Sequence, residues 1–294
     1  MIHVWIDWKN IILLLRPNQY IKNIFIFLPL FFSLKIIELN LFLNATIAFI
    51  AFSLISSAVY IFNDFHDIKE DRLHPKKKSR PLASGTITKS QSIGIMVVFF
   101  LLGFGLTYII HISVSVIVLA YVAMNIIYTL YLKKVAIIDV TIIALGFVMR
   151  IFVGSYSTDV PLSKWIIIMT FLLALFIVLA KRRDDVLIHL NTGNKMRKVV
   201  NNYNLQFIDT TLAIMAAVVI VTYILYTTSP GVVENFYGEH LYLTSLFVIL
   251  GIMRYLQIIL VMKDSGSPTE IFLKDHFIQM ILLGWGLSFV FILY

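Results

Sequence analysis

The chain has 294 residues, of which 60% are hydrophobic and only 14% charged, and its mean hydropathy is +0.90. This composition excludes an ordinary globular domain and indicates an integral membrane protein. Because the chain contains no cysteine, it has no disulfide, no thiolate nucleophile and no cysteine-based zinc or iron–sulfur site.

The first 16 residues carry charged side chains and lack a small-residue cleavage site, so we expect no removable signal peptide. Trp5, Trp8 and the apolar run 11–15 predict a short interfacial helix instead. Nine apolar runs follow, each compatible with a helix that spans the bilayer. They cover residues 21–37, 41–62, 92–110, 112–132, 136–155, 163–180, 209–228, 240–262 and 276–294. No linker marks a second domain, so we expect one all-α membrane domain over residues 1–294.

The basic residues predict the orientation of these helices. All but four of the 24 lysines and arginines fall in the connections on the side of the N-terminus. The exceptions are Lys35 and Lys164 on the other side, and Arg150 and Arg254 within helices. Since cytoplasmic connections are enriched in lysine and arginine, we expect the N-terminus in the cytoplasm and the C-terminus outside.

At the start of the first run, Arg16, Gln19, Lys22 and Asn23 present polar side chains where the chain enters the bilayer. One interpretation is a substrate contact. The alternative is anchoring by positive residues that contact lipid headgroups.

The stretch from Asn63 to Gly85 concentrates charge between apolar runs. If the preceding helix continues, Asp64, Asp67 and Asp71 share one face of it. Three neighbouring carboxylates favour a divalent metal such as Mg²⁺, and the basic residues that follow would bind the same phosphate groups. The alternative is a solvated loop whose surface salt bridges have no function.

Two further groups stand at the ends of later runs. Tyr128, Lys133 and Asp139 flank a tight turn, and Arg150 lies three helical turns after Asp139. An arginine inside the membrane should face a cavity, a partner or an anionic ligand, although a buried structural Asp139–Arg150 arrangement is the alternative.

The sixth run ends in a group of charged residues. These are Lys181, Arg182, Arg183, Asp184 and Asp185. They predict either a wall that binds phosphate and metal or an ordinary stop signal for the helix. A last group, residues 266–270 with Asp275, favours a turn and a helix cap.

Other chemistries find no support in the sequence. It contains no serine–histidine–aspartate motif, no Walker loop and no glycine-rich dinucleotide fingerprint. Nucleic-acid binding is disfavoured because the basic residues lie directly next to predicted membrane helices in the sequence.

These residues together resemble the UbiA superfamily of intramembrane prenyltransferases over nearly the full chain. The matching motifs are Asn63-Asp64-x-x-Asp67-x-x-x-Asp71 and Arg80-Pro81-Leu82-Ala83-Ser84-Gly85. The resemblance implies a bundle of nine helices around a central cavity, capped by cytoplasmic loops. Ordinary members bind prenyl diphosphate through Mg²⁺ held by two aspartate-rich motifs, but residues 181–185 lack the spaced aspartate pair of the second motif.

The decaprenyl-phosphate phosphoribosyltransferase branch of this superfamily is more similar. Its resemblance rests on segments that begin at Arg16, His74, Tyr128, Gly146, Lys181 and Ser267. It implies transfer of 5-phosphoribosyl from phosphoribosyl pyrophosphate to a polyprenyl phosphate, with Mg²⁺ as cofactor. Membrane lipid is a further expected partner, and nucleic acid is not.

This resemblance gives each residue an expected role. Asp64, Asp67 and Asp71 would hold Mg²⁺, and Asn63 would orient a ligand. Cations for the donor phosphates would be Lys77, Arg80, Lys181, Arg182 and Arg183, and those for the acceptor phosphate Lys22, Lys133 and Arg150. The remaining substrate-binding candidates are Arg16, Gln19, Asn23, Tyr128, Asp139 and Asp185.

Two competing functions stay open at this point. One is a conventional prenyltransferase that acts on an aromatic or other lipophilic acceptor, and the other is a lipid transporter. The sequence specifies neither the isoprenoid length nor the oligomeric state.

Overall fold

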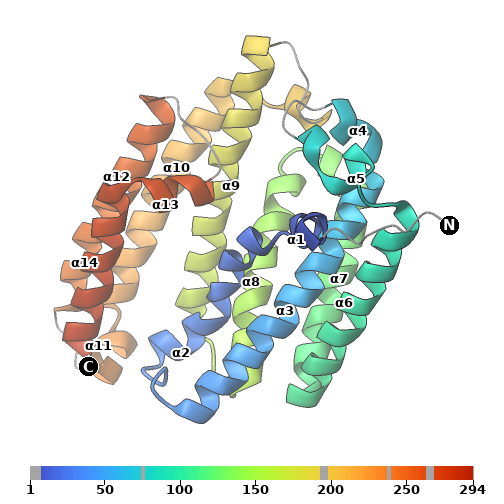
Figure 1. Cartoon of the computed structure of the whole chain (residues 1–294). Coiled ribbons are helices and arrows are strands. Elements are labelled where there is room, and N and C mark those ends of the chain that lie inside the picture. The colour runs from blue at the N-terminus through green and yellow to red at the C-terminus, as the bar shows by residue number, and fades with distance from the viewer. Residues whose placement is uncertain (1–7, 74–76, 193–197, 237–239, 263–267, 294) are drawn as a thin grey trace. The chain divides into compact units, whose positions relative to one another are not determined.

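The computed structural model describes residues 8–73, 77–192, 198–236, 240–262 and 268–293, and the backbone of these residues forms helices joined by turns, without a strand (Figure 1). His74, Pro75 and Ser267, which contribute to the motifs above, lie outside the described residues. The α-helices are α1 (Trp8–Leu15), α2 (Leu28–Phe32), α3 (Leu39–His66), α4 (Ile68–Leu73), α5 (Pro81–Ser84), α6 (Lys89–Ile110), α7 (Ile112–Leu130), α8 (Ile138–Thr158), α9 (Lys164–Thr192), α10 (Leu205–Thr228), α11 (Pro230–Phe236), α12 (Ser245–Leu260), α13 (Pro268–Lys274) and α14 (His276–Leu293). The 3₁₀ helices are η1 (Pro17–Phe27), η2 (Lys77–Ser79), η3 (Leu132–Lys134), η4 (Lys198–Asn202) and η5 (Leu241–Thr244).

Seven helices in the described part of the chain are long and apolar enough to cross a membrane. Six are α3, α6, α7, α8, α9 and α10, and the seventh is the stretch Leu241–Leu260 formed by η5 and α12. A helix satisfies its own backbone groups, which lipid cannot do. The chain is therefore an integral membrane protein, and these helices confirm seven of the nine predicted spans.

The other two predicted spans differ from a long helix. Residues 21–37 do not form one helix, because η1 ends at Phe27 and the short α2 stops at Phe32. Pro29 removes a backbone donor here, and the polar side chains of η1 bond to α3. The last span contains α14, whose apolar part is shorter than the other seven. Nine spanning helices are thus not confirmed.

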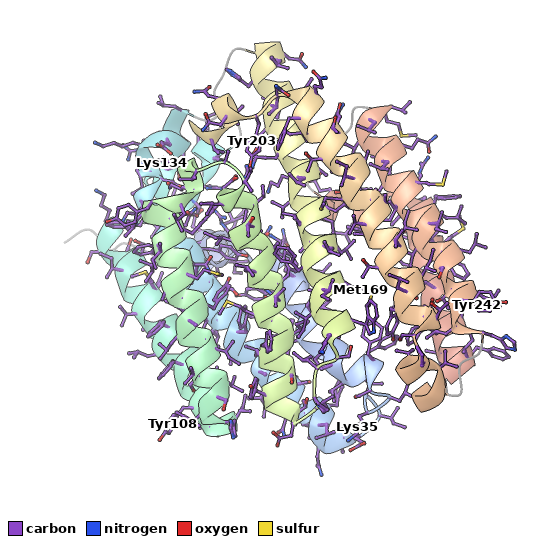
Figure 2. The ribbon with its side chains drawn as sticks, turned by 180° about the vertical axis from the view of Figure 1, so that it is seen from behind. Lys35, Tyr108, Lys134, Met169, Tyr203 and Tyr242 are labelled. Carbon is purple, nitrogen blue, oxygen red and sulfur yellow. The ribbon has the colours of Figure 1, made fainter. Side chains whose placement is uncertain are left out.

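The chain divides into two compact units, one of residues 1–135 and 146–162 and the other of residues 136–145 and 163–294. The single domain over 1–294 stays a prediction. In the first unit, α3 packs against α6 and α7, and its core includes Phe52, Ile55, Val118 and Tyr121. Figure 2 shows Lys134 and Tyr108 at opposite ends of the α6–α7 pair.

The second unit has its own apolar core. Helix α9 packs beside α10, and α12 packs beside α14 (Figure 1). Phe176, Leu212, Tyr255 and Ile259 are buried among these helices.

Candidate active site

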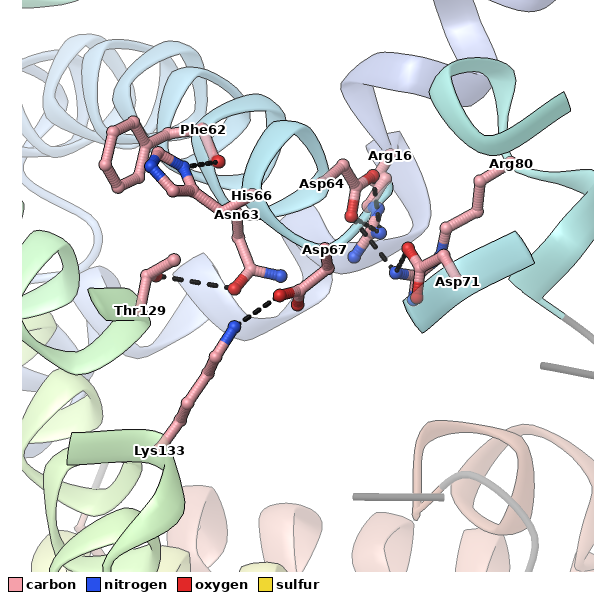
Figure 3. A network of polar contacts seen from close by, with 10 residues as sticks. All are labelled: Arg16, Phe62, Asn63, Asp64, His66, Asp67, Asp71, Arg80, Thr129 and Lys133. Atoms are coloured by element: carbon pink, nitrogen blue, oxygen red, sulfur yellow. Dashed lines mark hydrogen bonds and ion pairs between the residues drawn. The ribbon is translucent and has the colours of Figure 1, made fainter. Parts of the chain in front are cut away.

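Asp64 is the most enclosed carboxylate of the aspartate motif. It lies in the last turn of α3 and is only 2% exposed. Arg16 donates from Nη2 to both of its oxygens, at 2.5 and 2.6 Å, and Arg80 donates from Nη1 at 3.1 Å. Two cations thus neutralise one buried carboxylate (Figure 3).

Arg80 joins two carboxylates that stand on different helices. The same Nη1 that reaches Asp64 also donates to Asp71 of α4 at 2.7 Å. Arg80 precedes Pro81, and its extended backbone is the conformation that a following proline favours. The short helix α5 after it ends at Gly85, whose φ of 83° suits glycine, and Arg72 Nε donates to Ala83 O at 2.9 Å. These local features fix the position of Arg80 beside Asp64 and Asp71.

Asp67 faces a different partner. The helix does not continue through the motif as predicted, because α3 ends at His66 and α4 begins at Ile68, with Asp67 at the break. Asp67 accepts from Lys133 Nζ of η3, and Asn63 Oδ1 accepts from Thr129 Oγ1 of α7 at 3.3 Å (Figure 3). The end of α3 is therefore held to the end of α7 by one polar contact and to η3 by another.

The donor set can be compared with the needs of Mg²⁺. The described residues contain no group of three histidine, aspartate or glutamate side chains placed to hold a metal ion. Asp64 and Asp71 nevertheless both reach one nitrogen of Arg80, so their oxygens lie close together. Mg²⁺ binds proteins through one or two carboxylates and takes its other ligands from water and phosphate. Asp64 and Asp71 fit that requirement, and a three-carboxylate site stays a prediction.

The N-terminal segment lies along α3 through a series of polar contacts. Arg16 has a φ of 55°, a left-handed conformation that is uncommon for an arginine. The hydroxyls of Tyr20 and Ser57 are 2.7 Å apart, and Asn23 Nδ2 donates to Ser53 Oγ at 2.9 Å. Among the predicted site residues of η1, Gln19 and Lys22 are half-buried, and Asn23 is fully buried.

Arg150 is buried in α8, at 4% exposed. Its Nε donates to Asn23 Oδ1 at 2.8 Å, and its Nη1 donates to the carbonyl of Gly146 at 2.6 Å. The alternative of a structural Asp139–Arg150 pair is wrong, because Asp139 pairs with Arg182 instead.

In the second unit, Arg182 lies between two carboxylates. It is 1% exposed, with Nη2 at 2.8 Å from Asp139 Oδ2 and Nη1 at 2.6 Å from Asp185 Oδ2. Tyr203 donates to Asp139 Oδ1 at 2.7 Å and accepts from the N–H of Ile137 at 2.7 Å. Burial raises the pKa of Tyr203 to about 12, and the bond to Asp139 contributes to the rise. Tyr203 is therefore a neutral donor at physiological pH.

Arg183 is also bound by protein groups. It donates to both oxygens of Asp209 in α10, at 2.6 and 3.3 Å, and to Ile259 O at 2.9 Å. Lys181 is exposed. Residues 181–185 thus place two buried arginines in ion pairs and carry no spaced pair of aspartates that could hold a metal.

The structure adds residues that sequence reasoning missed. Asp209 accepts from Arg183, Tyr203 donates to the Asp139 carboxylate that pairs with Arg182, and Thr129 donates to Asn63. An acidic residue in an apolar run is itself a signal of a polar partner inside the membrane, so Asp209 could have been found. Lys77 in η2 and Tyr128 in α7 are half-buried.

Known proteins resemble the chain over most of its length. A family model described as the UbiA prenyltransferase family matches residues 25–281. A decaprenyl-phosphate phosphoribosyltransferase from Corynebacterium glutamicum is 27% identical over 284 residues, which cover 95% of this chain and 85% of that protein. Another from Mycobacterium tuberculosis is 26% identical over 278 residues, or 92% of this chain and 90% of the other. A solved UbiA homologue from Archaeoglobus fulgidus, bound to GPP and Mg²⁺, is 18% identical with a TM-score of 0.70, covering 96% of this chain and 99% of that one.

Proposed function

Because the chain belongs to the UbiA prenyltransferase family, as its motifs predict, we propose that it is a transferase that moves 5-phosphoribosyl from phosphoribosyl pyrophosphate to a polyprenyl phosphate. The products are polyprenyl-phosphoryl-5-phosphoribose and pyrophosphate. The observation that carries the choice of donor is Arg182, which lies between Asp139 and Asp185.

That observation argues against an ordinary prenyl-diphosphate site. A buried guanidinium between two carboxylates neutralises the groups that a second metal would need. The names of the relatives from Corynebacterium glutamicum and Mycobacterium tuberculosis support the same choice.

The first unit offers cations for the donor. Arg16 and Arg80 each contact a carboxylate of the aspartate motif. A pyrophosphate group would compete for these cations, because arginine binds phosphate as well as it binds carboxylate. If Arg16 and Arg80 both turned to the donor, Asp64 and Asp71 would become free to hold a metal. Lys77 and the residues Lys181, Arg182 and Arg183 are the further predicted cations for the donor phosphates.

Asp64 and Asp71 would hold Mg²⁺, with Asp67 as the third predicted ligand and Asn63 to orient a ligand. The chemistry that bound Mg²⁺ supplies at this place is neutralisation of charge on the departing pyrophosphate.

In the reaction, an oxygen of the lipid phosphate forms a bond to the anomeric carbon as the bond from that carbon to pyrophosphate breaks. Pyrophosphate leaves with the bonding electron pair. The lipid phosphate is already anionic, so no general base is needed. The carboxylates near the anomeric carbon stabilise the positive charge that develops there. Lys22 and Lys133 are the cations proposed for the acceptor phosphate, with Arg150 as the third candidate.

We further propose that this site faces the cytoplasm, since the basic connections gather at the end of the helices that carries it. The competing functions remain a conventional prenyltransferase, which the family name supports, and a lipid transporter. A transporter has less use for buried carboxylate–arginine pairs at one end of its helices.

The test is product analysis with purified protein, Mg²⁺, polyprenyl phosphate and ribose-labelled phosphoribosyl pyrophosphate. We expect a lipid-linked pentose phosphate and stoichiometric pyrophosphate. A labelled lipid formed only from geranyl diphosphate and a lipophilic acceptor would favour the conventional prenyltransferase, and no product from either donor would favour transport.

A further inference from the structure

Arg150 is an unusual charge for its surroundings. It lies in a helix that can span the membrane, yet within the described part of the chain it forms no ion pair with a carboxylate. All the other arginines that are at least nine-tenths buried there, Arg182 and Arg183, have aspartate partners. A buried cation without a counter-ion is costly, so its retention calls for a specific function.

The protein itself uses all three nitrogens of this guanidinium. Besides the bonds to Asn23 and Gly146, Nη2 donates to the Tyr121 hydroxyl at 3.4 Å. Three aromatic rings surround the group, with centroids 4.9 Å away for Phe52 and 5.3 Å away for Tyr121 and Phe147. Ring faces stabilise a cation in the absence of a carboxylate. Arg150 is therefore aimed at protein groups.

Its partner Asn23 connects Arg150 to the site. Asn23 is fully buried and receives the bond from α8 on its oxygen, while its Nδ2 donates to Ser53 of α3. Further along η1, Tyr20 contacts Ser57, which in turn donates to Leu15 O at 2.8 Å. Leu15 is followed in the sequence by Arg16, which bonds to Asp64.

A second, independent feature holds η1 against α8 one turn beyond Arg150. A Cβ atom added at Gly154 would lie 2.0 Å from Ile26 O and 2.8 Å from Ile26 C. Backbone contact of this kind leaves no room for any side chain, so glycine is required. The α8 face formed by Gly146, Arg150 and Gly154, spaced four residues apart, thus receives η1 by a hydrogen bond and by direct backbone packing.

From these contacts we infer that Arg150 is a positioning residue, which fixes η1 between α8 and α3 and so places Arg16 and Lys22 for the substrate phosphates. It acts through Asn23 and does not touch the substrate. The functional part of this inference rests on the proposed transfer reaction, and the positional part does not. It competes with the sequence-based expectation that Arg150 binds the acceptor phosphate.

Lysine should not replace arginine in this role. The guanidinium presents donors in a planar fork that reaches Asn23, Gly146 and Tyr121 at once, whereas an ammonium is a single point charge. A residue that only attracted a phosphate would tolerate lysine much better. Arg150→Lys therefore separates positioning from charge.

The kinetic experiment compares Arg150→Lys, Asn23→Ala and Gly154→Ala. We expect each to lower kcat/KM for polyprenyl phosphate at least about ten-fold, and all three to a similar extent, because each displaces η1 and with it Arg16 and Lys22. The matched control is Gly105→Ala, since a Cβ at Gly105 meets nothing within 4 Å. A large rise in KM for the acceptor in Arg150→Lys, with Asn23→Ala and Gly154→Ala near wild type, would overturn the inference.

A spectroscopic experiment tests the position of η1 without any turnover. Because the chain has no cysteine, spin labels can be placed only at introduced cysteines, here at the exposed residues Ile24 of η1 and Leu39 of α3. We expect a narrow distance distribution in the wild-type background that broadens or shifts with Arg150→Lys and Gly154→Ala but not with Gly105→Ala. An unchanged distribution would contradict positioning. If phosphoribosyl transfer itself proved wrong, this result would still stand.

Discussion

Asp64 is held by two arginines that reach it from different segments of the chain. Asp64 lies only 16 positions from Arg80, which also bonds to Asp71. Its contact with Arg16 joins residues 48 positions apart, and that of Asp67 with Lys133 joins residues 66 apart. Such pairs depend on how α3 packs with η1 and α7, which hydropathy does not encode.

Removing the charge of Asp64 tests its role directly. We expect Asp64→Asn to reduce turnover at least about a hundred-fold while the protein still folds, because asparagine keeps the side-chain shape but neither holds a metal nor balances Arg16 and Arg80. Steady-state pyrophosphate release gives the rate, and size-exclusion chromatography checks folding. The control is Asp159→Asn, at an exposed position with φ of 52°, which asparagine tolerates. Retained activity in Asp64→Asn would remove Asp64 from the site.

Tyr203 gives a pH-dependent prediction. Burial raises its pKa from 10.0 to about 12, so its contribution to stability is fully present below about pH 10 and is lost as the pH rises to about 12. Tyr203→Phe should destabilise the protein by about 1 to 3 kcal/mol at neutral pH, because Asp139 and Ile137 lose their shared partner. Thermal unfolding measured across this range should show the difference from wild type shrinking above pH 10. A difference that stays constant there would disprove this role, and Tyr131→Phe, at an exposed tyrosine, serves as the control.

At the scale of elements, hydropathy predicted the seven long helices because each contains an apolar stretch of membrane-spanning length. It failed at residues 21–37, where an equally apolar run forms η1 and α2. Tyr20 and Asn23 bond to serines of α3, and this tertiary demand overrides the local preference for an α-helix. The break at Asp67 was missed as well, since nothing in the aspartate spacing marks the end of α3.

Helix α5 provides an element-scale test. Gly85 ends it in a left-handed conformation, which costs an alanine about 1 kcal/mol. We expect Gly85→Ala to shift α5 and Arg80, to lower the free energy of unfolding by about that amount, and to raise KM for phosphoribosyl pyrophosphate several-fold. Gly94→Ala lies in α6 with open space around it and should leave both quantities unchanged or slightly improved. Equal effects of the two substitutions would argue against a role for α5 in placing Arg80.

At the scale of the whole molecule, charge asymmetry bears on the orientation of the helices and not on their number. Lysine and arginine count toward orientation wherever a connection is short, whatever its conformation. The number of spans, in contrast, depends on local breaks such as the one after Phe27. The predicted membrane location is confirmed, and the orientation stays a prediction.

The orientation can be measured because the chain has no cysteine of its own. Lys78 is exposed on η2 and His111 is exposed between α6 and α7, with the length of α6 between them. We expect a membrane-impermeant maleimide to label Lys78→Cys in inverted vesicles only and His111→Cys in intact cells. The reverse pattern would place the aspartate motif outside the cytoplasm.

The most direct test of the proposed reaction is the initial rate of pyrophosphate release under four conditions: phosphoribosyl pyrophosphate with and without polyprenyl phosphate, each for wild type and for Asp64→Asn. We predict release only when wild type has both substrates. Equal release without the lipid phosphate, or equal rates for the two proteins, would contradict phosphoribosyl transfer at this site.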